Sequence, residues 1–396
     1  MSRPPFEVAD IIRAAAGDFF EKHRSWLNGL HRKVLSAILR CRTAALGGHR
    51  DRCSRCGHQA ISYNSCRNRH CPKCQSNARD KWLAARQEEL LNVPYVHVVF
   101  TLPHQLAPLV FHNKKLLYGL LFRASSATLL EVAADPRHLG AEIGFLSVLH
   151  TWGQNLLHHP HVHCVIPSGG LSADHQQWIH SRHSFFLPVR VLSRVFRGKF
   201  LDGLKRLHRN RELYLAGPLK LLTEEKPFRQ FLRTLHRQDW VVYAKAPFGG
   251  PLHVLHYLAR YTHRVAISNH RIVNIADGKV TFRWKDYTAK SKQRLMTLTA
   301  EEFLRRFLIH TLPGGFVRIR FSGFLANRRR AQLLPVCRRL LEQFSHGEIR
   351  APATAPPKDA DVRPCPLCGG PMILVERLTA LDLAREFWRS AVADTS

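Results

Sequence analysis

The stretch "HHPHVHCVIP", residues 158–167, is the most informative part of the sequence for predicting the fold of this protein. Histidines alternate with apolar residues along it, which is the pattern of a β-strand with one buried face. Side chains two residues apart on a strand point to the same face, so His161 and His163 project together and Val162 points the other way. Two imidazoles side by side can bind one divalent ion. Histidines that only pack or hydrogen-bond are common, however, so a third ligand is needed to sharpen the signal.

The preceding run, "IGFLSVLHTWGQ" at residues 143–154, offers that third ligand. It also reads as a strand, and His150, Trp152 and Gln154 alternate along it. The short piece at residues 155–160 suits a hairpin connection between the two runs. If the runs pair, either His150 or Gln154 reaches the ion, and the spacing leaves both open.

Ten cysteines form no disulfide framework if the protein is cytosolic, as we expect. The N-terminal "MSRPPFEVAD" lacks the apolar core of a signal peptide, and no apolar run has the length of a transmembrane helix. Cys53-x-x-Cys56 and Cys71-x-x-Cys74 place two thiolates on each of two turns, which predicts one tetrahedral, structural Zn²⁺ site. The roles of four other residues stay open: Cys66, His70, Cys365 and Cys368.

The charge points to a polyanionic partner. Lys and Arg number 60 against 29 Asp and Glu, giving a formal net charge of +31 spread over the chain. Nucleic acid is the first candidate for such a partner, ahead of a merely soluble basic protein. No basic amphipathic anchor indicates a membrane surface. The candidate residues for DNA contact are Arg67, Arg69, Arg260, Arg264, Arg328 and Arg329.

Two further segments are informative. "RIVNIADGKVTFRW", residues 271–284, predicts a hairpin with Asp277-Gly278 as its turn. "PLHVLHYLARYTHRV", residues 251–265, predicts a helix. Tyr257 and Tyr261 lie one turn apart on it, roughly opposite a leucine stripe and beside cationic side chains.

Together these features resemble the HUH nucleases, and within them the rolling-circle insertion-sequence transposases of the IS91 family. The resemblance covers most of the chain and rests on ordered blocks. These blocks are "CRNRHCPKCQ", "HVVFTLPH", "LHTWGQNLLHHPHVHCVIPSGG", "YLARYTHRVAISNHRI" and "FVRIRFSGFLANRRR".

The resemblance implies roles for the residues already singled out. His161 and His163 become ligands of a catalytic Mg²⁺ or Mn²⁺. His150 is favoured over Gln154 as the third ligand, because the spacing resembles that of the relaxases. Tyr257 and Tyr261 become the nucleophiles that form a covalent 5′-phosphotyrosine with single-stranded or locally melted DNA at element ends. A bacterial, cytoplasmic, nucleoid-associated transposase is implied, and its oligomeric state is not.

The expected fold class is α+β, with an HUH-type domain built on an antiparallel sheet flanked by helices. The expected domains are an N-terminal helical and zinc-binding domain (1–92), the HUH-type domain (93–300), a basic helical region (301–350), and a linker with a Cys-pair tail (351–396). Two rival functions stay open. One is a histidine-triad-type nucleotide hydrolase acting on DNA with His161 as nucleophile, and the other is a non-catalytic, zinc-dependent DNA-binding regulator.

Overall fold

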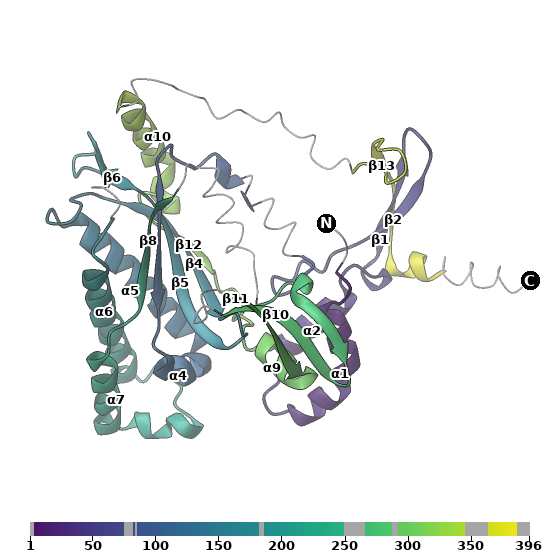
Figure 1. Ribbon diagram of the computed structural model, residues 1–396, viewed down its shortest axis with the longest axis horizontal. Helices are drawn as coiled ribbons and strands as arrows, with labels where there is room; N and C mark the ends of the chain where they lie inside the picture. The colour runs from purple at the N-terminus through teal and green to yellow at the C-terminus, as the bar shows by residue number, and fades with distance from the viewer. Residues whose placement is uncertain are drawn as a thin grey trace, which may run out of the picture.

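The computed structural model describes residues 4–74, 82–83, 85–181, 186–248, 266–286, 292–344 and 363–385. Over these residues, helices combine with antiparallel sheets, so the expected α+β class is confirmed (Figure 1).

The largest sheet has five strands in the order β12-β4-β5-β3-β8, each antiparallel to its neighbours. Their bounds are β3 (Tyr95–Thr101), β4 (Gly144–Trp152), β5 (His158–Pro167), β8 (Val242–Phe248) and β12 (Ile319–Gly323). The two histidine-bearing runs therefore pair as the expected hairpin, β4-β5. Strand β12 comes from a region expected to be helical; it extends the sheet because Phe321 and its neighbours pair with β4.

One face of this sheet carries the main hydrophobic core. Phe100, Leu149 and Val162, from three neighbouring strands, are almost fully buried there. The helices α5 (Lys114–Ala134) and α6 (Val189–Arg209) cover this face (Figure 1). On the other face of the sheet, leucines of α10 (Asn327–Phe344) pack in one cluster with Val148 of β4 and Val165 of β5. His150 of β4 shares this second face with His161 and His163 of β5.

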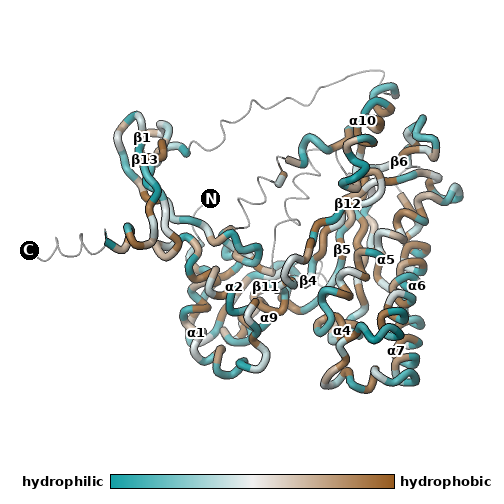
Figure 2. The backbone as a smooth tube through the Cα atoms, turned by 180° about the vertical axis from the view of Figure 1, so that it is seen from behind, coloured by the Kyte–Doolittle hydropathy of each residue, from teal (hydrophilic) through white to brown (hydrophobic). Residues whose placement is uncertain are grey.

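Contrary to the expectation that no apolar run has the length of a transmembrane helix, helix α5 is long and apolar enough to cross a membrane, and it is the one such helix among the described residues. In the fold, 67% of its most apolar stretch is buried, which is what a core helix requires. Figure 2 shows hydrophobic segments gathered along α5 and the neighbouring strands.

A second core joins the start of the chain to a distant segment. It contains α1 (Val8–Lys22) and α2 (Gly29–Arg40) together with β9 (Ile272–Ala276), β10 (Lys279–Asp286), β11 (Lys292–Thr299) and α9 (Ala300–Leu308). The expected hairpin at β9-β10 is present. Asp277 and Gly278 both have positive φ, +50° and +67°, as a two-residue hairpin turn requires. The domain limits expected at residues 92 and 300 thus separate elements that share one core.

A small three-stranded ribbon has the order β13-β1-β2, with bounds β1 (Gly48–Cys53), β2 (Gln59–Tyr63) and β13 (Met372–Leu378). It brings the C-terminal tail against the N-terminal module (Figure 1). Four shorter elements complete the described helices and strands: α4 (Ala107–His112), β6 (Gly169–Leu171), β7 (Trp178–His180) and α7 (Glu225–Arg237). Four 3-10 turns connect them: η1 (Ala44–Leu46), η2 (His104–Leu106), η3 (Gly217–Thr223) and η4 (Asn269–Arg271).

Candidate functional site

Three histidines meet on the second face of the central sheet. His150 of β4 lies directly opposite His161 of β5 in the ladder, and opposed residues of an antiparallel pair point to the same face. His163, two residues further along β5, joins them. One ring nitrogen from each of the three lies within 4.8 Å of the others. The ring centroids are 4.4 Å apart for His150 and His163, and 4.8 Å apart for His161 and His163.

This cluster contains His150 and not Gln154. Strand β4 ends at Trp152, so Gln154 lies past the ladder. There its backbone carbonyl accepts a hydrogen bond of 2.7 Å from Arg271. The pairing of β4 with β5 therefore selects between the two alternatives that spacing leaves open.

The electrostatics keep the rings of His161 and His163 neutral. Burial lowers the pKa of His161 to about 4. Burial, with the neighbouring His150, His161 and His97, lowers the pKa of His163 well below its usual value. A neutral imidazole has the free lone pair that a metal needs.

The donor set fits a divalent metal ion. Nitrogen ligands lie about 2.1 Å from such an ion, which places them roughly 3.0–3.4 Å from one another, so the three rings need only a small contraction. His161 is partly exposed whereas His150 and His163 are buried, so the cluster faces solvent on one side. Three imidazoles suit Mn²⁺, Fe²⁺ or Zn²⁺ better than Mg²⁺, which prefers oxygen ligands.

His97 belongs to this site, although its place in the sequence gives little indication of a role there. Its Nε2 lies 2.8 Å from Nδ1 of His163, and the two rings stack 5.0 Å apart with an interplanar angle of 9°. If Nε2 of His163 held a metal ion, its Nδ1 would carry the proton and donate the hydrogen bond to Nε2 of His97. The one indication in the sequence is that His97 is a polar residue in the otherwise apolar strand "YVHVVFT". Two further side chains lie beside it, because Tyr243 and Lys245 of β8 pair with Val99 and His97.

The candidate nucleophiles lie outside the residues that the structure describes. Tyr257, Tyr261, Arg260 and Arg264 all fall in the segment 249–265. Their roles stay predictions from the resemblance.

The cysteines form two clusters, and this corrects the expected single site. Cys71 and Cys74 gather with Cys41 and Cys66, with Sγ–Sγ distances of 3.5 Å from Cys41 to Cys74 and 3.6 Å from Cys66 to Cys74. Four thiolates around Zn²⁺ at about 2.3 Å lie roughly 3.8 Å apart, so this geometry fits zinc. Hydrogen bonds from Cys41, Cys66 and Cys71 lower the pKa of the Cys74 thiol far below its usual value, so the cluster holds a thiolate readily.

The other cluster joins the two ends of the chain. Cys53 and Cys56 gather with Cys365 and Cys368, with Sγ–Sγ distances of 3.5 Å from Cys53 to Cys368 and 3.7 Å from Cys56 to Cys365. The pairing of β13 with β1 causes this arrangement, because it brings the C-terminal CxxC turn beside the first one. Spacing along the chain cannot reveal such a partner. The C-terminal pair, whose role the sequence leaves open, therefore completes a four-cysteine cluster.

Four of the arginines proposed to contact DNA lie within the described residues. Arg67 and Arg328 are exposed. Arg69 donates to the backbone carbonyls of Leu312, Pro313 and Phe316, which ties the cysteine-rich loop to the segment before β12. Both terminal nitrogens of Arg329 donate to the carboxylate of Glu142. Arg69 and Arg329 thus have structural contacts already.

An antiparallel sheet that carries a three-histidine cluster is joined here to two four-cysteine clusters, and comparisons with known proteins identify the class of this protein as transposases. Residues 144–332 match a family described as "Putative transposase", and residues 11–102 match a family described as "Transposase zinc-binding domain". The chain belongs to the IS91 family of insertion-sequence transposases.

Two relatives cover nearly the whole chain. A protein of Sinorhizobium fredii named "Putative transposase y4qJ" is 53% identical over 388 residues, which are 95% of this chain and 96% of the relative. The "Transposase for insertion sequence element IS801" of Pseudomonas savastanoi pv. phaseolicola is 30% identical over 364 residues, which are 90% of this chain and 86% of the relative. No solved structure matches the chain.

Proposed function

We propose that this transposase nicks single-stranded or locally melted DNA at the ends of its insertion sequence and transfers the strand through a 5′-phosphotyrosine intermediate. The observation that carries the proposal is the cluster of His150, His161 and His163 on the face of the sheet that helices α5 and α6 leave uncovered. An ion held there would neutralise the charge that develops on a phosphodiester during attack and on the departing oxygen. The proposed setting is the nucleoid of a bacterial cell.

In the proposed reaction, the phenolic oxygen of Tyr257 or Tyr261 attacks the scissile phosphorus. A phosphotyrosine bond forms, the bond to the 3′ oxygen breaks, and the phenolic proton leaves to solvent while the DNA regains a 3′-hydroxyl. A phenol with its usual pKa of about 10 is a weak nucleophile, so the cationic side chains near it, Arg260 and Arg264, would assist. Because the phosphotyrosine conserves the bond energy, the strand can be rejoined to a new 3′-hydroxyl without ATP.

The first experiment tests the histidine cluster. A labelled single strand carrying an element end is incubated with the protein and Mn²⁺, and cleavage is followed on a gel. His161→Ala should abolish cleavage but keep the affinity for DNA within a few-fold of that of wild type, because DNA binding depends on charge distributed over the chain. His159→Ala is the matched control, since this histidine lies on the same strand but outside the cluster, and it should retain most of the activity. Cleavage that persists in EDTA would favour the histidine-triad hydrolase instead.

The second experiment identifies the nucleophile. The covalent adduct is digested and mapped by mass spectrometry, and it should carry a 5′-phosphate ester on Tyr257 or Tyr261. Tyr243→Phe is the matched control, because Tyr243 is 55% exposed on the histidine face and offers a competing phenol. An adduct on Tyr243 or on His161 would overturn the mechanism. The absence of any cleavage or adduct with every divalent ion would favour the non-catalytic regulator.

A further inference from the structure

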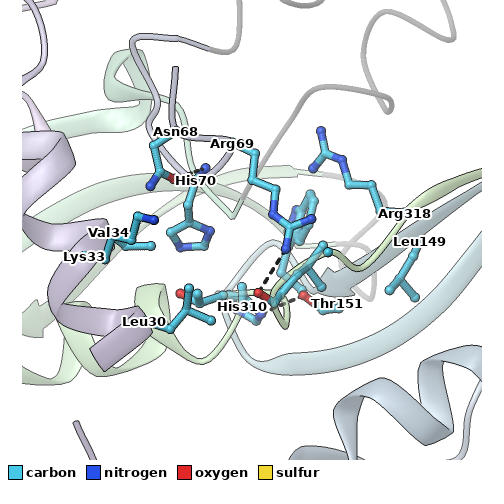
Figure 3. Close-up of a pocket in the computed structure, with 14 residues that line it drawn as sticks. Leu30, Lys33, Val34, Asn68, Arg69, His70, Leu149, Thr151, His310 and Arg318 are labelled. Atoms are coloured by element: carbon cyan, nitrogen blue, oxygen red, sulfur yellow. Dashed lines mark hydrogen bonds between the residues drawn. The ribbon is translucent and has the colours of Figure 1, made fainter. Parts of the chain in front are cut away.

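A cavity of about 230 Å³ lies where the zinc-binding module meets the central sheet (Figure 3). Four segments build it: α2, the loop at residues 68–70, the end of β4, and residues 310–318. Its lining includes side chains that are almost fully buried, among them Val34, Leu149 and His310. Exposed residues such as Lys33 and Gly315 also line it. The cavity is therefore a formed part of the junction and opens to solvent.

The walls of the cavity are mainly apolar. Leu30 and Val34 of α2 face Leu149 of β4, and Trp152 and Leu312 complete the surface. An aromatic ring with aliphatic neighbours is the surface on which proteins hold unpaired bases, since any base has a flat apolar face.

The same cavity is strongly cationic. Lys33, Arg69 and Arg318 line it, and none of its described lining residues is Asp or Glu. Figure 3 shows Arg69 between Lys33 on one side and Arg318 on the other. Three backbone carbonyls hold the Arg69 guanidinium in place. Burial and the charge of Arg69 lower the pKa of Arg318 to about 10, so two like charges are held close together in a partly dehydrated place that favours an anion.

The cavity adjoins the histidine cluster through one residue. Trp152, which lines the cavity, stacks on His150 with ring centroids 4.6 Å apart and an interplanar angle of 20°. His310 meets the ring of Trp152 edge-on, with ring centroids 6.1 Å apart. A strand of DNA with a phosphate at the cluster therefore has a neighbouring nucleotide within reach of the cavity.

We propose that this cavity binds one unpaired nucleotide of the DNA strand, adjacent to the phosphate that the histidine cluster holds. The base lies against Leu30, Val34 and Trp152. The nucleotide's phosphate lies beside Lys33, Arg69 and Arg318. The inference rests on the proposed nuclease function, and it adds a nucleotide-binding site that selects where the strand is cut. A free phosphate is a poorer match, because it would leave the apolar walls without a partner.

The test scans a labelled single strand of the element end with abasic sites, one position at a time, by fluorescence anisotropy in EDTA. In wild type, base removal at one position near the cleavage site should weaken binding about tenfold, the usual effect of losing a stacked base. Leu30→Trp fills the cavity, so this penalty should disappear. Ser36→Trp is the matched control on the same helix, because Ser36 is exposed and does not line the cavity, and the penalty should persist. An unchanged penalty in Leu30→Trp would overturn the proposal.

A second pair of variants covers the case in which Leu30→Trp does not fold, as judged by thermal unfolding. Lys33→Gln should weaken the binding of the intact and the abasic strand alike, because an abasic nucleotide keeps its phosphate. Arg32→Gln, at an exposed neighbour outside the cavity, should have a smaller effect on both. Equal effects of the two would also overturn the proposal. The proposal would also be overturned if inorganic phosphate displaced the strand as effectively as a deoxynucleoside monophosphate does. These binding measurements need no cleavage, so a nuclease that lacks the nucleotide site, and a nucleotide site without nuclease activity, give different results.

Discussion

Replacing Cys365 and Cys368 together by serine should lower the zinc content of the purified chain from two ions to one. The two clusters are separate four-cysteine sets, so each accounts for one tetrahedral ion. The double substitution removes two of the four thiolates from the cluster that contains Cys53 and Cys56. A structural zinc site binds its ion with about 10–16 kcal/mol at pH 7, and a site reduced to two thiolates loses the ion to a chelator.

The same substitution should release strand β13. Little apolar burial holds this strand, because Ile373, Leu374 and Val375 are each about half exposed, at 55%, 49% and 52%. The buried cluster beside this cysteine set consists of Cys53, Cys365 and Met372 only, and Leu378 is buried at the end of β13. A three-stranded ribbon with so small a core is marginal without its metal. Hydrogen exchange at residues 363–385 should therefore rise towards that of an unfolded chain, while exchange in the central sheet stays slow.

Native mass spectrometry counts the ions, and exchange mass spectrometry reports on β13. Cys337→Ser is the matched control, since Cys337 is a buried cysteine outside both clusters, and it should keep two ions. Cys41→Ser with Cys66→Ser should remove the other ion and leave β13 in place. Two ions in the Cys365 and Cys368 variant, or one ion in wild type, would refute the two-cluster arrangement.

Three further predictions follow from single side chains. His97→Ala should weaken Mn²⁺ binding about 10–100-fold, measured by electron paramagnetic resonance. His97→Gln should restore part of the affinity, because the side-chain carbonyl can accept the hydrogen bond from His163. Equal Mn²⁺ affinities of wild type and His97→Ala would refute the role of this contact. Burial lowers the pKa of His158 to about 3 from 6.5 in the unfolded chain, so its contribution to stability is complete above pH 6.5 and is lost as the pH falls towards 3. His158→Gln should therefore reduce the loss of unfolding free energy between pH 7 and pH 5 by about 2 kcal/mol in denaturant titrations, and an unchanged loss would contradict this. Arg328→Gln should weaken DNA binding and reduce its salt dependence, because Arg328 is exposed. Arg329→Gln should leave both unchanged and lower stability by at most about 1 kcal/mol, because Arg329 is paired with Glu142. Equal effects of the two variants on DNA binding would reject this distinction.

Local sequence patterns were enough to predict several structural features of this transposase. The alternation in residues 158–167 predicted the strand β5, and the paired run before it predicted the hairpin that places His150 opposite His161. The Asp277-Gly278 pair predicted its turn for the same reason. Each of these features depends on residues close together in sequence, where backbone geometry alone determines which side chains meet.

The partners from distant segments could be found only in the tertiary structure. His97 reaches His163 because β3 lies beside β5, and nothing in its own segment indicates which strand will be the neighbour. In the same way, α1 and α2 share a core with β9–β11 and α9, across the domain limits expected at residues 92 and 300.

The sequence by itself predicted that the pairs Cys53-x-x-Cys56 and Cys71-x-x-Cys74 bind metal, since a CxxC turn places two thiolates together whatever surrounds it. Which pairs combine was decided by the tertiary structure. Cys53 and Cys56 lie near Cys71 and Cys74 in sequence, yet the β1-β13 ladder brings Cys365 and Cys368 to them instead. The physical reason is that a tetrahedral site needs four sulfur atoms within a few ångströms, and strand pairing across more than three hundred residues, not separation along the chain, sets that distance.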